Sequence, residues 1–237
     1  MPSLWSWPLA TADDLDRRAV HALLSEWLDI DHHAKSKPWS WSAHPGELRI
    51  GLLDDGLVER LLDRAEAYRR SRTHRAGVTP VAAARQIAAA SWGLIADLRP
   101  GLAWTLEFTS PVTFRRGQRF VPWPAPSSVF GSLRATWRTF AAPHVGDLEL
   151  DLALDPVIVT SVRGHSVTER VALRDRRSAT RATLQVPVDG FLGNVTYTID
   201  GTVDPAAVSS LARLAPFCGV GAYTTRGFGA VRALATG

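Results

Sequence analysis

Two adjacent histidines and two lysines lie close together in a polar segment that follows an expected helix. They are His32, His33, Lys35 and Lys37, and the chain has no other lysine, against 25 arginines. Histidine transfers protons near neutral pH, and surroundings can tune the pKa of lysine whereas arginine stays charged. The segment therefore indicates general acid–base chemistry. In an arginine-rich chain, it favours cleavage of a phosphodiester that supplies its own nucleophile, which is RNA through its 2′-hydroxyl.

Two other interpretations of this segment stay open. The cations can simply be solvated side chains that complement the dipole at the end of the helix. Alternatively, Asp29, Asp31, His32 and His33 resemble the Asp-His-His string of a class of manganese phosphoesterases, although the further aspartates of that class are not found. The remaining histidines are interpreted as surface or capping residues: His21, His44, His74, His144 and His165.

A second candidate element is a glycine-rich segment near the C-terminus. Gly219, Gly221, Gly227 and Gly229 surround Arg226. Glycine tolerates positive φ and lets successive amides point the same way, so such a loop can bind a phosphate. It is neither a Walker A loop nor a dinucleotide fingerprint, because a helix precedes it and a strand follows it. The alternative is a wide turn before a terminal strand.

Composition indicates a globular protein with a phosphate-rich partner. The chain has 237 residues, of which 46% are apolar and 21% charged, and its net charge is +4. The positive excess lies entirely in residues 102–237, the half that contains the glycines. Cys218 is the only cysteine, which excludes an intrachain disulfide, and no apolar run is long enough to cross a bilayer. We expect a cytoplasmic protein.

Hydrophobic periodicity predicts the same order of elements in each half of the chain. In the first half we expect strands over 3–9, 39–42 and 47–53 and helices over 15–28 and 57–72, the second ending in a basic run, while 81–97 reads as either helix or strand. In the second half we expect strands over 104–114 and 228–234, and two strands that each have a bend, one over 157–162 and 167–173 and the other over 183–188 and 193–199. We expect helices over 129–140, capped by Ser127 and Ser128, and over 204–214. If 81–97 contains a strand, both halves read β-α-β-β-α-β. The predicted fold class is α+β, with tandem ferredoxin-like (RRM-like) domains over 1–101 and 102–237.

Further basic and aromatic residues are candidate RNA contacts. Arginines cluster after the first strand of the second half, on its helix and at the tip of its long hairpin, where they could span phosphates or form a solvated face. They are Arg115, Arg116, Arg134, Arg138, Arg174, Arg176 and Arg177. Trp39 and Trp41, beside the His/Lys segment, are candidates for base stacking.

Three stretches resemble the CRISPR-associated endoribonucleases that cut precursor CRISPR RNA, Cas family six of the RAMP superfamily. Residues 106–114 (LEFTSPVTF) resemble the family's Ser-Pro-Thr-x-Phe strand with one inserted valine. Residues 124–133 (PAPSSVFGSL) with Trp137 resemble the helix that follows. Residues 218–231 resemble the family's glycine-rich signature, which is the most specific of the three.

The resemblance implies two ferredoxin-like domains and RNA contact through the glycine-rich segment. The implied contact residues are Gly219, Gly221, Tyr223, Arg226, Gly227 and Gly229. Family members often place a catalytic histidine before a Lys-Pro-aromatic strand. Lys37-Pro38-Trp39 matches that landmark, so the resemblance points to His32 or His33.

The expected activity is cleavage of CRISPR repeats without a metal or other cofactor. His32 or His33 would deprotonate the 2′-hydroxyl or protonate the leaving 5′-oxygen, and Lys35 or Lys37 would stabilise the phosphorane. The products would carry a 2′,3′-cyclic phosphate and a 5′-hydroxyl. The expected partner is precursor CRISPR RNA, and other Cas proteins or a second copy of the chain are further candidates. The alternative is a catalytically silent RAMP subunit that binds guide RNA as a scaffold.

Overall fold

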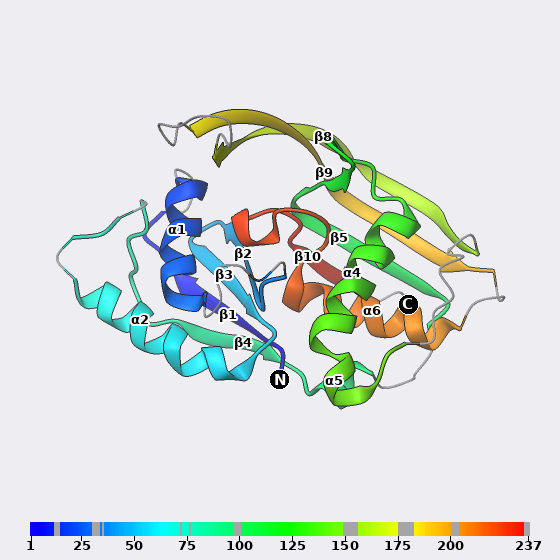
Figure 1. Cartoon of the computed structure of the whole chain (residues 1–237), viewed down its shortest axis with the longest axis horizontal. Helices are drawn as coiled ribbons and strands as arrows, with labels where there is room; N and C mark the ends of the chain where they lie inside the picture. Colours follow the sequence, from blue (N-terminus) through cyan, green and yellow to red (C-terminus); the bar gives the residue numbers. More distant parts are fainter. Residues whose placement is uncertain are drawn as a thin grey trace.

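Two four-stranded antiparallel sheets lie side by side in the computed structural model (Figure 1). The structure describes residues 1–11, 15–29, 34, 36–71, 73–75, 77–96, 101–148, 156–174, 183–200 and 204–234. Within these ranges, every helix is too short or too polar to cross a membrane.

The first sheet has the strand order β2-β3-β1-β4. Its elements are β1 (Ser3–Pro8), α1 (Arg17–Leu28), β2 (Trp39–His44), β3 (Glu47–Leu52), the short 3-10 helix η1 (Asp55–Leu57), α2 (Val58–Arg70) and β4 (Arg85–Ala89). Residues 81–97 therefore contain a strand, followed by the short helix α3 (Trp92–Ile95). The order and the antiparallel pairing are those of a ferredoxin-like β-α-β-β-α-β unit.

Tryptophans fill the space between the first sheet and its helices. The ring centroid of Trp7 on β1 lies 5.6 Å from that of Trp27 on α1 and 5.7 Å from that of Tyr68 on α2. The N-cap of α1 is Asp16, whose carboxylate accepts the amides of Arg18 and Ala19. This cap begins the helix at Arg17, so two consecutive arginines lie in its first turn.

The second sheet has the order β10-β5-β9-β8 and repeats the unit. Its elements are β5 (Ala103–Val112), the hairpin β6 (Phe114–Arg116) and β7 (Arg119–Val121), α4 (Pro126–Phe140), α5 (Ala142–Val145), β8 (Val157–Arg174), β9 (Thr183–Ile199), α6 (Pro205–Cys218), the 3-10 helix η2 (Thr224–Arg226) and β10 (Val231–Leu234). The α+β class with tandem ferredoxin-like units is thus confirmed.

Strands β8 and β9 extend well beyond the rest of their sheet. They bend at the paired residues Gly164 and Gly193, where a Cβ on either glycine would overlap the opposite strand's backbone. We call residues 165–174 and 183–192 the β8–β9 arm. The arm curves over the molecule toward α1 (Figure 1). It thereby brings the second half of the chain over the start of the first helix.

Helix α6 packs against both sheets and sets their relative position. Gly51 of β3 approaches the end of α6 so closely that a Cβ there would overlap the carbonyl oxygen of Phe217. Leu53, Trp92 and Ile95, all from the first half, are buried in the hydrophobic core of the second half. The two sheets therefore share packed apolar surface.

Among the predicted boundaries that differ from the structure, three involve a helix cap, a proline or the glycine-rich loop. Helix α4 begins at Pro126 without a side-chain cap, so the predicted capping by Ser127 and Ser128 is wrong; proline suits the first turn because its φ is fixed and it needs no acceptor. Helix α6 continues to Cys218 with Pro216 inside it. The last strand begins only at Val231, because the preceding residues belong to the glycine-rich loop.

Candidate functional site

The glycine-rich loop, residues 219–230, connects α6 to the last strand. Gly219, Gly221, Gly227 and Gly229 have φ of 72°, 82°, 83° and 68°, values that favour glycine. A Cβ on Gly221 or Gly229 would overlap a backbone carbonyl oxygen of the chain itself. The close approach that the glycines allow is therefore made, in large part, to the protein's own backbone.

Several amides of this loop are engaged within the chain. The amide of Val220 donates to the carbonyl of Gly229, that of Ala222 to Thr113 and that of Gly229 to Pro111, each at 2.8 Å. These amides hold the loop against the end of β5. They do not form the phosphate cradle that the glycine spacing suggested, so an RNA contact here would use other groups.

The loop's carbonyls bind it to the first half of the chain. The carbonyl oxygen of Thr225 accepts hydrogen bonds from Nε1 of Trp41, at 2.8 Å, and from Nδ1 of His21, at 2.6 Å. The carbonyl of Gly227 accepts one from Nη1 of Arg17, at 2.7 Å. Burial, and then the charge of Arg226, lower the pKa of His21, which favours a neutral imidazole that donates through Nδ1. The loop is thus a junction between the two halves.

A cavity of about 400 Å³ lies between this loop, α4 and the segment that leads into β2. Lys37 lines it, opposite Ser132 of α4 and Tyr223 of the loop. The Nζ of Lys37 lies 3.1 Å from Oδ2 of the buried Asp29, whose Oδ1 accepts a hydrogen bond of 2.8 Å from Nε1 of Trp39. Asp29 therefore holds Lys37 at the wall of the cavity.

The other candidate catalytic residues, His32, His33 and Lys35, lie outside the described residues. In sequence they belong to the segment between Asp29 and Ser36. Asp29 is the ion-pair partner of Lys37, and Ser36 lines the cavity. One flank of the segment thus lines the cavity, and the other is paired with a residue that lines it.

A neighbouring cavity of about 360 Å³ contains two of the predicted arginines. It is lined by Arg115 and Arg116 of β6 and shares Ser132, Gly221 and Ala222 with the Lys37 cavity. Nη2 of Arg116 donates to Oγ of Ser128 at 2.9 Å. The structure therefore brings the basic hairpin beside the glycine-rich loop, and both arginines are exposed.

Other predicted RNA contacts are placed differently. Arg134 is only 9% exposed and lies on the core face of α4, so the expected surface contact is wrong. Within the described part of the chain, its Nε and Nη1 have no hydrogen-bond partner. Arg138, one turn further along α4, is exposed and pairs with Asp147 at 3.0 Å. The side chain of Arg174, and the whole of Arg176 and Arg177, lie outside the described residues.

The two tryptophans considered for base stacking are buried. Trp39 and Trp41 are each 2% exposed, because both rings pack into the first core while their indole N–H groups bind Asp29 and Thr225. The stacking prediction is therefore wrong. Local spacing did not reveal that these tryptophans would anchor the site.

Tyr223 and Arg226 contact residues from the second half. The ring of Tyr223 lies 5.1 Å from that of Phe120, and Cζ of Arg226 lies 5.9 Å from the Tyr223 ring. Nη1 of Arg226 also donates to the carbonyl of Ala172 in the β8–β9 arm, at 3.1 Å. Val171 and Val188 of the arm also form a small apolar cluster with Phe228 of the loop, so the arm rests on the loop through both apolar and polar contacts.

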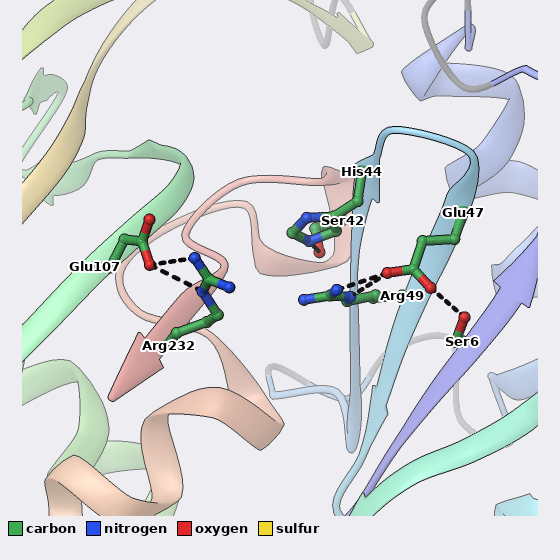
Figure 2. A network of polar contacts seen from close by, with 7 residues as sticks. All are labelled: Ser6, Ser42, His44, Glu47, Arg49, Glu107 and Arg232. Carbon is green, nitrogen blue, oxygen red and sulfur yellow. Dashed lines mark hydrogen bonds and ion pairs between the residues drawn. The ribbon is translucent and has the colours of Figure 1, made fainter. Parts of the chain in front are cut away.

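A separate polar network lies where the two sheets face each other (Figure 2). Arg49 pairs with Glu47 on β3, and Arg232 of β10 pairs with Glu107 of β5, each with a closest distance of 2.6 Å. His44 lies over the gap between the two arginines. Burial, followed by the charge of Arg49, lowers its pKa to about 4, so the imidazole is neutral at physiological pH.

Comparisons with known proteins identify what the chain is similar to. The model of the CRISPR-associated endoribonuclease Cas6 family matches residues 106–231. A solved Cas6 product complex is 25% identical with a TM-score of 0.74, over 99% of each chain. Thermus thermophilus Cas6 is 25% identical with a TM-score of 0.68, over 99% of this chain and 98% of that chain. A Cas6-related protein of Pyrococcus furiosus, 12% identical with a TM-score of 0.59 over 99% of each chain, shares the fold. No curated protein matches the chain.

Proposed function

The chain belongs to the CRISPR-associated endoribonuclease Cas6 family, and we propose that it cleaves precursor CRISPR RNA within its repeats without a metal ion. The observation that carries this proposal is the cavity where Lys37, held by Asp29, faces the glycine-rich loop. The segment with His32 and His33 joins these two residues in sequence. We also propose that 1–101 and 102–237 are separate domains, with the catalytic groups in the first and most RNA contacts in the second.

In the proposed reaction, the 2′-oxygen next to the scissile phosphate forms a bond to phosphorus while the bond to the 5′-oxygen breaks. His32 or His33 takes the proton of the 2′-hydroxyl or gives a proton to the leaving 5′-oxygen. The ammonium of Lys37 stabilises the extra negative charge of the phosphorane. One product ends in a 2′,3′-cyclic phosphate and the other begins with a 5′-hydroxyl.

Asp29 would act as a positioning residue in this reaction. Its two carboxylate oxygens bind Nζ of Lys37 and Nε1 of Trp39, which fixes the ammonium relative to β2. Arg115 and Arg116, which remain largely exposed beside the loop, would contact backbone phosphates on the far side of Ser132.

The direct test is cleavage of end-labelled repeat RNA in excess EDTA, with His32→Ala, His33→Ala and Lys37→Met compared with the wild type. We expect one metal-independent cut that is lost in one histidine variant while its RNA binding persists. The product ends decide the mechanism: a 5′-phosphate with a 3′-hydroxyl would contradict it.

A non-catalytic RAMP subunit is the alternative, since a RAMP protein that binds different RNA substrates has the same fold at 14% identity. Tight binding of repeat RNA that stays intact in excess wild-type protein would support this alternative and overturn the proposed activity.

A further inference from the structure

A third cavity, of about 460 Å³, lies on the other side of the glycine-rich loop from Lys37. Three segments that are far apart in the sequence form it: the first turn of α1, the β8–β9 arm and the end of the loop. Each of them contributes arginine: Arg17 and Arg18 from α1, Arg170 from the arm and Arg226 from the loop. Nothing in the reaction proposed above uses this cluster.

Among the described residues, two carboxylates line this cavity against the four guanidinium groups, and one of the two is committed elsewhere. Asp16 accepts the amides of Arg18 and Ala19 as the N-cap of α1. Glu169 on the arm lies 3.7 Å from Nη2 of Arg17, which is beyond hydrogen-bond distance. The described lining of the cavity therefore has a net positive charge, and Glu169 is a loosely held counter-ion within it.

The four arginines divide into two pairs with different surroundings. Arg17 and Arg226 are half-buried and tied to backbone carbonyls, and burial is the main cause that lowers the pKa of each. Both stay protonated, because arginine does not lose its proton in proteins. Arg18 and Arg170 are exposed, and in the described part of the chain neither side chain has a hydrogen bond or ion pair. The two half-buried guanidinium groups have lost part of their hydration, and the two exposed ones lie beside them. This arrangement favours the binding of an anion, whose oxygens would accept the hydrogen bonds that water otherwise accepts.

We propose that this cavity binds a backbone phosphate of the RNA and that Glu169 stands in the position of that phosphate in the RNA-free protein. The inference rests on the proposed function, which supplies RNA as the ligand. On binding, the phosphate takes over the guanidinium of Arg17 from the carboxylate, while Arg18 and Arg170 approach the same phosphate from α1 and from the arm. Glu169 therefore lowers the affinity for RNA.

The length of α1 gives an estimate of the distance along the RNA between this phosphate and the cleaved bond. The helix runs from Arg17, at this cavity, to Leu28, next to the ion-paired Asp29. Its 12 residues span about 18 Å at a rise of about 1.5 Å per residue. A stacked strand advances about 3.4 Å per nucleotide, so the phosphate lies roughly five nucleotides from the scissile bond.

The test compares the double variant Arg18→Ala/Arg170→Ala with Arg64→Ala/Arg85→Ala. The control removes the same charge from exposed positions on α2 and β4, so general electrostatic attraction falls equally in both. The ligand is repeat RNA made uncleavable by a 2′-deoxy nucleotide at the cut site, and binding is titrated at several salt concentrations. We expect the cavity variant to bind at least tenfold more weakly than the control, with a salt slope smaller by about one. Equal affinities of the two variants would overturn the proposal.

The variant Glu169→Gln should change the affinity for RNA in the opposite direction. We expect it to bind the same RNA about threefold more tightly at low salt, since the carboxylate no longer competes. Affinity that is unchanged or weaker would contradict the role of Glu169. A neutral methylphosphonate roughly five nucleotides from the cut should weaken binding by the wild type but not by Arg18→Ala/Arg170→Ala. Equal weakening of both proteins would also contradict the proposal.

These measurements are independent of catalysis, because the RNA cannot be cut. If the wild type binds repeat RNA but never cleaves it, the proposed activity is wrong. The phosphate site is then still decided by the binding affinities of the cavity variant and its control. If cleavage is confirmed and the cavity variant equals its control, the phosphate site alone is refuted.

Discussion

Protonation of His44 should destabilise the protein, because the imidazole lies in the polar network between the two sheets (Figure 2). Its Nε2 is 3.0 Å from the hydroxyl oxygen of Ser42. A proton on His44 would place a third positive charge near Arg49 and Arg232, in a partly desolvated site. The folded state therefore binds this proton less readily than the unfolded chain.

The pH dependence follows from linkage. The pKa of His44 falls from 6.5 to about 4 on folding, so its contribution to stability is fully present above pH 6.5 and is lost as the pH falls through about 4. At about 1.4 kcal/mol per pKa unit, the upper limit is about 3 kcal/mol. The imidazole keeps part of its contact with water, which reduces the effect. Between pH 7.5 and 5, we expect a loss of about 1 kcal/mol from this residue.

Urea unfolding of the wild type and of His44→Gln at about pH 7.5 and about pH 5 measures this contribution. The variant keeps a polar side chain but cannot titrate, so its free energy of unfolding should fall by about 1 kcal/mol less than that of the wild type. His21, whose pKa is also lowered, remains in both proteins and cancels in the difference. If both proteins lose the same free energy on acidification, the desolvated environment deduced for His44 is wrong.

Three further variants probe the loop, the lysine and the buried arginine. Gly227→Ala should lower the free energy of unfolding, measured in urea, by about 1–3 kcal/mol. The loss should exceed that of the control Gly117→Ala, because both glycines have positive φ but only at Gly227 would a Cβ press on neighbouring side chains. Asp29→Asn should reduce the cleavage rate at least tenfold by releasing Lys37, at unchanged RNA affinity; a wild-type rate would show that the ion pair does not position the lysine. Arg134→Met should leave RNA affinity unchanged in a binding titration. It should raise the free energy of unfolding by about 1 kcal/mol, because the substitution removes buried hydrogen-bond donors that have no partner among the described residues. Weaker RNA binding by this variant would show that Arg134 contacts RNA.

Much of the fold could be predicted from local patterns. Alternating apolar residues identified β2 and β5, and Asp204 followed by Pro205 marked the start of α6, because strand periodicity and helix caps are encoded over a few residues. The end of α6 was less predictable. The predicted helix stopped at residue 214, whereas α6 continues past Pro216 to Cys218 and packs on both sheets.

The candidate site divides in the same way. The glycine spacing and the Lys37-Pro38-Trp39 landmark are local, so the sequence alone was sufficient to find the glycine-rich loop, the segment of candidate catalytic residues and the family resemblance. Which groups meet is decided by contacts between distant residues. Only the tertiary structure showed that Trp41 is buried as an anchor of the loop and that Arg134 faces the core. The sequence indicated a bend in each of the two long strands, but only the tertiary structure brought Arg17 and Arg170 to one cavity, because the direction of the β8–β9 arm and the docking of the loop on α1 depend on contacts between distant residues.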